Sequence, residues 1–269
     1  MSDGPIGMFD SGFGGLTVAR AVMDLLPDED LVYLGDTARY PYGPRPLDEV
    51  ALYAHQIAEE LVERRGAKML VVACNTAAAA ALESIEQRYD VPVVGVIEPG
   101  ARALLEATVT GRVGVIGTVG TIGSGAYQEA VSELAETAAE AELEALACPG
   151  FVEFVERGLF DGPQVHVLAS RLLAPAIEAK VDTLLLGCTH YPYLARAISD
   201  VMGSDVVLVS SADETAFEVH RMLNRTGLAR GERSGSATFI TTGDVNSFEE
   251  LGRKLLGPEL ASAEQVRLP

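Results

Sequence analysis

Two short stretches predict how this chain folds: Val71-Val72-Ala73-Cys74-Asn75-Thr76 and Leu184-Leu185-Leu186-Gly187-Cys188-Thr189-His190. Each is an apolar run that ends in a cysteine and small polar residues, and a helical pattern follows each. Such runs, bounded by residues common in turns, are typical of buried strands in a parallel sheet. Ligands of open α/β sheets bind beyond the carboxyl ends of these strands. The sequence therefore predicts one site built by two halves of the chain, each supplying a thiol.

Strand and helix patterns alternate along both halves. Strands are expected at residues 6–9, 31–34, 91–96, 113–118, 206–209 and 237–242, in addition to the two cysteine strands. Helices are expected at residues 17–26, 47–65, 77–88, 97–108, 165–178 and 214–223, with an alanine- and glutamate-rich helix after residue 118 and a short one from Ser247. This alternation predicts doubly wound, mainly parallel sheets. The repeated order of strand and thiol predicts an internal duplication.

We expect two α/β domains related by a pseudo-twofold axis, with the site in the cleft between them. Residues 1–98 and 210–269 are assigned to the first domain, and residues 99–209 to the second. The tail is placed in the first domain because the second half already has its full set of strands by residue 209.

Composition excludes several classes of function. The formal net charge of −19 repels phosphate backbones and anionic lipids, and no local basic stripe offsets it: the adjacent pairs of basic residues are Arg64-Arg65 and Arg253-Lys254. No apolar run reaches eighteen residues, and no basic segment followed by an apolar one precedes the first strand. We expect a soluble, cytoplasmic protein that contacts neither nucleic acid nor membrane directly.

The cysteines and histidines do not have the spacing of metal ligands. Cys74, Cys148 and Cys188 are an odd number with no CxxC motif, which argues against a disulfide framework and structural zinc. The four histidines also fail spacings such as HExxH. No metal is expected.

A dinucleotide site is the obvious competitor near the N-terminus. A strand precedes Gly12-Phe13-Gly14, and Asp36 lies where a ribose-binding acid would fall. However, Thr17 occupies the third glycine position, and Asp10 sits where the phosphates would approach. These glycines are better explained by the backbone geometry of a tight turn.

The positions of the thiols favour acid–base chemistry. A free cysteine is usually a small buried apolar residue, which suits Cys148. Cys74 and Cys188 each end a strand before a helix, where the helix N-terminus lowers a thiol pKa from about 8.5. Two thiols facing across a cleft can invert a stereocentre, one removing a proton and the other delivering one. A cysteine protease needs one thiol with a histidine, and a disulfide oxidoreductase needs its pair close in sequence.

Pyridoxal phosphate is disfavoured as the cofactor for such an inversion. It requires a Schiff-base lysine, and the chain has three lysines. Lys68 and Lys180 precede the cysteine strands, at the wrong end of the sheet, and Lys254 lies in the terminal helix. We therefore expect no cofactor.

The combined motifs resemble those of the glutamate racemases in order and spacing, over nearly the whole chain. They are Asp10-Ser11-Gly12-Phe13-Gly14-Gly15-Leu16, Gly35-Asp36-Thr37, Pro41-Tyr42-Gly43, Cys74-Asn75-Thr76-Ala77 and Gly187-Cys188-Thr189-His190-Tyr191-Pro192. The resemblance implies an isomerase that interconverts L- and D-glutamate without a cofactor, supplies D-glutamate for peptidoglycan, and forms a homodimer.

The resemblance also implies roles for individual residues. Cys74 and Cys188 match the acid–base pair, Asp10 matches the auxiliary residue of the first thiol, and Glu153 and His190 match those of the second. Substrate contacts are implied at Asp10, Ser11, Pro41, Tyr42, Gly43, Cys74, Asn75, Thr76, Thr118, Thr121, Thr189 and His190.

Two alternatives stay open. One is a racemase of aspartate or another amino acid in the same superfamily. The other is a non-catalytic binding protein, such as an inhibitor of a DNA-processing enzyme. Aligning the two repeats also sets Asp10 against Gly117 and Thr76 against His190, so the two thiols are expected to have different helpers.

Overall fold

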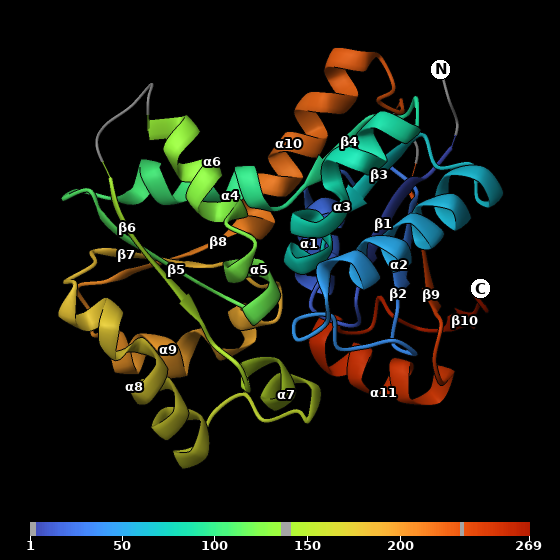
Figure 1. Cartoon of the computed structure of the whole chain (residues 1–269). Helices are drawn as coiled ribbons and strands as arrows, with labels where there is room; N and C mark the ends of the chain where they lie inside the picture. The colour runs from blue at the N-terminus through green and yellow to red at the C-terminus, as the bar shows by residue number, and fades with distance from the viewer. Residues whose placement is uncertain (1–3, 136–140, 232–233) are drawn as a thin grey trace.

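Two parallel β-sheets, each flanked by helices, form the core of the computed structural model, which describes residues 4–135, 141–231 and 234–269. The first sheet has the strand order β10-β9-β2-β1-β3-β4, and the second has the order β6-β5-β7-β8. Every pairing in both sheets is parallel. In Figure 1 the sheets lie side by side, the second on the left and the first on the right. The predicted α/β class with two parallel sheets is confirmed.

The strands are short, as is usual for sheets of this type. Their bounds are β1 Ile6–Asp10, β2 Leu31–Gly35, β3 Met69–Val72, β4 Val93–Gly95, β5 Arg112–Gly117, β6 Glu142–Ala147, β7 Thr183–Leu186, β8 Val207–Ser210, β9 Ala237–Thr241 and β10 Ala263–Gln265.

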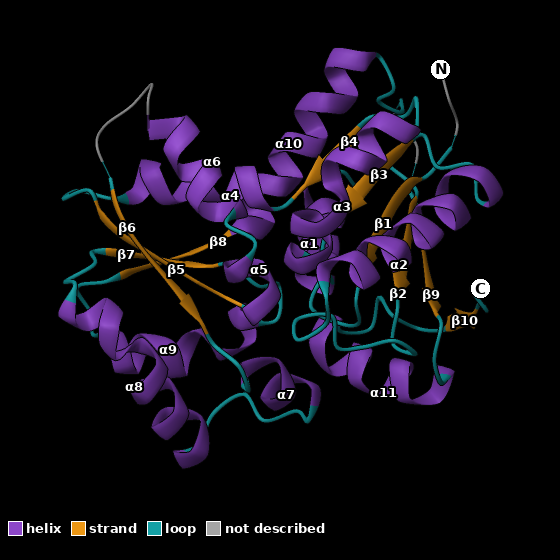
Figure 2. Cartoon of the chain, in the orientation of Figure 1, coloured by secondary structure: helices purple, strands orange, loops and turns teal. Residues whose placement is uncertain are grey.

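Helices cover both faces of each sheet (Figure 2). The α-helices are α1 Leu16–Leu25, α2 Leu47–Glu59, α3 Asn75–Arg88, α4 Ile97–Ala107, α5 Val119–Gly123, α6 Ala126–Ala135, α7 Phe151–Glu156, α8 Pro163–Glu178, α9 Ala195–Met202, α10 Ser211–Thr226 and α11 Val245–Leu256. The π-helix η1 Glu60–Arg64 extends α2, and the 3₁₀-helix η2 Tyr191–Leu194 precedes α9. Part of the predicted alanine- and glutamate-rich helix, residues 136–140, lies outside the described residues.

The two sheets repeat one strand order. The first four strands lie in the order β2-β1-β3-β4, and the next four lie in the corresponding order β6-β5-β7-β8. The order reverses between β1 and β3 and again between β5 and β7, and such reversals are where open α/β sheets bind ligands. The duplication inferred from sequence is therefore seen in the topology.

The C-terminal tail completes the first sheet. Strand β9 pairs with β2 along its whole length, and β10 adds beyond β9. The expected strand at residues 237–242 is present, whereas β10 was not predicted. The predicted domain division at residues 98 and 210 stays a prediction, because α10 packs against both α1 and α4.

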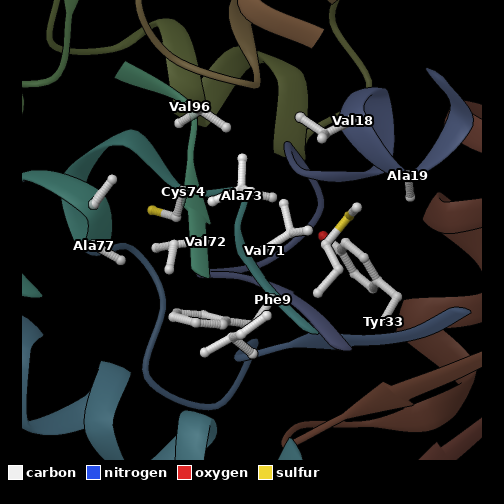
Figure 3. Close-up of a cluster of buried hydrophobic side chains, with 14 of the residues drawn as sticks. Phe9, Val18, Ala19, Tyr33, Val71, Val72, Ala73, Cys74, Ala77 and Val96 are labelled. Atoms are coloured by element: carbon white, nitrogen blue, oxygen red, sulfur yellow. The ribbon is translucent and has the colours of Figure 1, made fainter. Parts of the chain in front are cut away.

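The central strands β1 and β3 of the first sheet are buried on both faces. Phe9, Val71, Val72 and Ala73 are fully buried, and Figure 3 shows their side chains packed around the segment that carries Cys74. Fixing the strand ends in a close-packed interior also fixes where the residues after them lie.

The segment after Cys188 differs from the prediction. Cys74 is the N-cap of α3, as expected for a thiol at a helix start. Cys188 is instead followed by a turn and by η2, and the α-helix begins only at Ala195. Pro192 lies in the first turn of η2, where it cannot donate a backbone hydrogen bond.

A buried ion pair ties the tail to the amino ends of the first sheet. The Lys68 Nζ lies 2.5 Å from the Glu29 Oε2 and donates to the Leu228 carbonyl at 2.9 Å. The Arg230 N–H donates to the Glu29 Oε1 at 2.7 Å. Lys68 thus has a structural role at the end of the sheet remote from the thiols.

Replacing Lys68 should destabilise the fold strongly. Lys68→Met leaves the Glu29 carboxylate buried without its cation, so we expect the free energy of unfolding to fall by about 3 kcal/mol. The exposed Lys254, which pairs only with Glu250 in the described contacts, supplies the control Lys254→Met, expected to change it by less than about 0.5 kcal/mol. Urea unfolding measures both, and equal losses would contradict a special role for the buried pair.

Candidate active site

The two thiols occupy corresponding places in the two sheets. Cys74 lies two residues after β3, and Cys188 lies two residues after β7. Strands β3 and β7 are each the neighbour of the strand that begins their repeat, β1 or β5. Both thiols therefore lie at a carboxyl end, beside a reversal of strand order.

One small cavity joins the thiols and most of the predicted site. Cys74 and Cys188 are 5% and 6% exposed and both line it. Its other lining residues are Asp10, Ser11, Pro41, Tyr42, Gly43, Asn75, Thr76, Thr118, Val152, Thr189 and His190. Of the predicted substrate contacts, only Thr121 does not line this cavity. Val152 was not predicted.

Burial raises the pKa of the Cys74 thiol to about 12. The negative charge of Asp10 adds to this effect, while the N–H groups of Ala77 and Ser11 act in the opposite direction. The start of α3 does act to lower this pKa, through the Ala77 N–H, but its effect is the smaller one. Desolvation and a nearby carboxylate outweigh the helix terminus.

A histidine and a carboxylate stand beside Cys188. The His190 Nδ1 lies 3.9 Å from the Cys188 Sγ, and the His190 Nε2 lies 2.6 Å from the Glu156 Oε1. Burial works to lower the His190 pKa, but the hydrogen bonds with Cys188 and Glu156 and the Glu156 charge raise it well above its usual value. These partners therefore favour the protonated form of His190.

The resemblance implied Glu153 as an auxiliary residue on the side of the second thiol, but the acid that bonds His190 is Glu156. Both belong to α7, but Glu153 is exposed, and it lines an adjoining space of about 360 Å³ with Cys148 and Tyr191. The sequence contains two acids one helical turn apart, and helical spacing alone does not distinguish them. The packing of α7 against η2 makes the choice.

Asp10 joins the two halves. It is fully buried, and its Oδ1 accepts the Gly12 N–H at 2.8 Å. Its Oδ2 accepts the Thr189 hydroxyl at 3.2 Å, and Thr189 directly follows Cys188. The carboxylate that raises the Cys74 pKa thus also fixes the segment carrying the other thiol.

Three buried threonine hydroxyls make a second junction. The Oγ1 atoms of Thr76, Thr118 and Thr121 lie 2.9 to 3.1 Å apart in a closed triangle. Thr76 comes from α3, whereas Thr118 caps α5 by accepting the Thr121 N–H. Thr121 is one corner of the triangle but does not line the cavity, so it can affect a ligand only through Thr76 and Thr118.

Asn75 has one free polar atom. Its Nδ2 donates to the Tyr127 hydroxyl at 2.7 Å, and its buried Oδ1 has no partner among the described residues. A buried polar atom without a partner is uncommon in folded proteins. The Asn75 amide is therefore available to a ligand in the cavity.

Asp36, directly after β2, fixes the loop that follows it, residues 37–46, part of which lines the cavity. The carboxylate of Asp36 accepts hydrogen bonds from the Tyr42 hydroxyl, from the Arg39 Nε at 2.8 Å and from the Thr242 hydroxyl at 2.6 Å. Tyr42 therefore lines the cavity with its ring while its hydroxyl is already bonded. The Gly43 carbonyl accepts the Gly120 N–H at 2.8 Å, which joins this loop to the second half.

A larger hollow, away from the thiols, lacks comparable chemistry. A space of about 1140 Å³ lies between α4 and α10, and Arg102 and Arg221 on its wall both pair with Glu218. It contains neither thiol. Across the described residues, no group of three or more His, Cys, Asp or Glu is arranged to bind a metal, and no helix is long and apolar enough to cross a membrane.

The chain is similar to known proteins along nearly its whole length. A family model described as Asp/Glu/Hydantoin racemase matches residues 16–218. Glutamate racemase of Parafrankia sp. (strain EAN1pec) is 54% identical over 97% of this chain and 94% of the relative. The crystal structure of a Bacillus anthracis glutamate racemase isoform has a TM-score of 0.94 at 42% identity, covering 100% of this chain and 99% of that one. Francisella tularensis glutamate racemase in complex with D-glutamate has a TM-score of 0.90 at 31% identity, covering 99% and 98%.

Removing the Glu156 carboxylate should lower the pKa of His190. In Glu156→Gln the charge and the charge-assisted bond that hold the proton on His190 are lost, while burial still favours the neutral ring. We expect the imidazole to lose its proton at a lower pH than in the wild type, as followed by NMR of ¹⁵N-labelled histidine. His190→Asn identifies the resonance. Glu153→Gln is the control, and an equal drop in that variant would contradict the pairing.

Proposed function

The chain belongs to the Asp/Glu/Hydantoin racemase family, and from that membership we propose that it racemises glutamate with two thiols and no cofactor. It is an isomerase with the function of its glutamate racemase relatives, which match over almost the whole chain. The observation that carries the two-thiol proposal is the shared cavity: Cys74 and Cys188, one from each sheet, line the same small space.

The reaction is a proton exchange at the α-carbon. One cysteine, as thiolate, takes the α-proton of glutamate and becomes a thiol. The other, as thiol, gives its proton to the opposite face of the carbanion and becomes a thiolate. Backbone N–H groups and hydroxyls near helix starts hold the substrate carboxylates. Because the carbon acid is weak, oriented donors in a desolvated site must supply much of the stabilisation.

The two thiols are activated differently. Burial and Asp10 raise the pKa of Cys74 and so favour its neutral thiol form. It is therefore the proton donor at rest, and Asp10 accepts its proton when Cys74 must act as the base. Cys188 faces the His190 imidazolium, and a cation beside a sulfur stabilises the thiolate. Each direction of the reaction thus depends on a different helper.

We also propose the cellular role and assembly that accompany this activity. D-glutamate made here supplies peptidoglycan synthesis, the enzyme is cytoplasmic, and it works as a homodimer. Membership of the family supports the first of these proposals, and nothing in the two-thiol mechanism depends on the other two.

Alanine at either thiol should abolish racemisation. For Cys74→Ala and Cys188→Ala we expect turnover of D-glutamate, followed by circular dichroism, to fall at least about 100-fold, because each variant lacks an acid–base group. In D₂O the wild type should place deuterium on the α-carbon of the product. D-aspartate tested in parallel separates the two substrates. Cys148→Ala, the third buried cysteine, is the control. Full turnover in either thiol variant would rule out the mechanism, and a wild type that binds glutamate without exchange would indicate a binding protein.

Replacing Asp10 and replacing His190 should slow opposite directions of the racemisation. Asp10→Asn should slow the direction in which Cys74 removes the proton more than the other, and His190→Asn should slow the direction that depends on Cys188. Each loss should be about 10²-fold or more, as for other acid–base helpers. Initial rates and solvent-deuterium incorporation from each enantiomer measure this. Equal losses in both directions for both variants would contradict distinct roles.

A further inference from the structure

The glycine-rich turn of the first half lies directly against His190 of the second half. A Cβ atom added to Gly14 would lie 2.3 Å from the His190 Nδ1 and 2.7 Å from the His190 Cε1. It would also lie 2.6 Å from the Thr189 Oγ1. Real Cβ atoms essentially never approach other atoms so closely. A side chain at residue 14 would therefore occupy the place of the ring edge that faces Cys188.

Backbone conformation does not explain the glycine. Gly14 is not among the residues with positive φ, so an alanine could adopt its backbone angles without strain. The explanation from turn geometry that the sequence favoured therefore does not apply here. Residue 14 is limited to glycine by lack of space, because His190 and Thr189 occupy the volume that a side chain would need.

Residues on either side of Gly14 also contact the segment that carries His190. The Thr17 hydroxyl donates to the Gly14 carbonyl at 2.9 Å and lies 3.4 Å from the Thr189 carbonyl. The Thr189 hydroxyl donates to Asp10. Gly12 also approaches the pair, since a Cβ there would lie 3.2 Å from the Glu156 Oε1. The start of α1 thus packs in a fixed position against residues 188–190.

We propose that Gly14 is a positioning residue that seats the His190 ring from the opposite half, so that its Nδ1 faces Cys188. The proposal rests on the racemase function proposed above. His190 is 2% exposed, and its Nε2 is already fixed by Glu156, so the close backbone at residue 14 removes the remaining freedom of the ring. The helper of one thiol is therefore aligned only while the two halves are in contact.

The test is Gly14→Ala, with Gly123→Ala as the matched control. Gly123 also has no positive φ, and a Cβ there meets nothing within 4 Å. We expect Gly14→Ala to lower kcat roughly 10- to 100-fold, as a misplacement of about 1 Å does. The loss should be larger in the direction that depends on His190, and KM should change by less than about threefold. The control should keep wild-type rates.

A double-mutant cycle shows whether Gly14 acts through His190. If it does, Gly14→Ala/His190→Asn should be no slower than His190→Asn alone. Multiplying losses, or equal losses in both directions, would overturn the proposal. If Gly14→Ala does not fold, replacing both neighbours in the same chain, His190→Asn with Thr189→Ala, should relieve the clash and restore folding. Failure of that rescue would also overturn it.

A readout that does not need turnover separates this proposal from the proposed function. The ¹⁵N resonances of His190 should show a lower pKa in Gly14→Ala than in the wild type, because the ring leaves its partners. An unchanged titration with unchanged rates would refute the positioning role. A wild type that fails to racemise glutamate would refute the proposed function, and the titration would still test the position of the ring.

Discussion

Desolvation at the seam between the two sheets is the constraint on which the site depends. The carboxyl ends of β1 and β3 meet those of β5 and β7 there, and Asp10, Cys74, Cys188 and His190 are all nearly inaccessible to water. A buried polar group is costly unless it is bonded. Each half meets this demand with groups of the other half: Thr189 bonds Asp10, and the threonine triangle joins α3 to α5.

The same desolvation makes the two sides of the cavity chemically unlike. On the first side, an anion next to a buried thiol keeps the proton on sulfur. On the second, a carboxylate holds a charged imidazole next to the other sulfur. Two repeats with one strand order therefore place a carboxylate beside the sulfur on one side of the cavity and a histidine–carboxylate pair beside the sulfur on the other. The duplication places the two thiols at corresponding positions, and the residues that differ between the repeats make the surroundings of the two thiols different.

The sequence predicted the parts of the molecule that depend on short-range patterns. Apolar runs located the strands other than β6 and β10, and the repeated strand–thiol order located Cys74 and Cys188 on one cavity. Contacts between distant segments were beyond its reach. Glu153 and Glu156 are equivalent by spacing, and only the docking of α7 on η2 selects Glu156. The three-residue strand β10 has no pattern long enough to detect. Tyr42 was predicted to contact substrate and does line the cavity, but its hydroxyl donates to Asp36. Asp36 also bonds Thr242, about 200 residues away, and no local motif encodes that network.

The pairing of β9 with β2 has a consequence for synthesis of the chain. Until residues 237–241 leave the ribosome, the β2 edge of the first sheet has unpaired N–H and C=O groups, while all strands of the second sheet are already available. An open strand edge is a template for pairing with other chains. The sheet whose strands are made first is thus completed last, and a nascent chain stalled before residue 237 keeps this edge open.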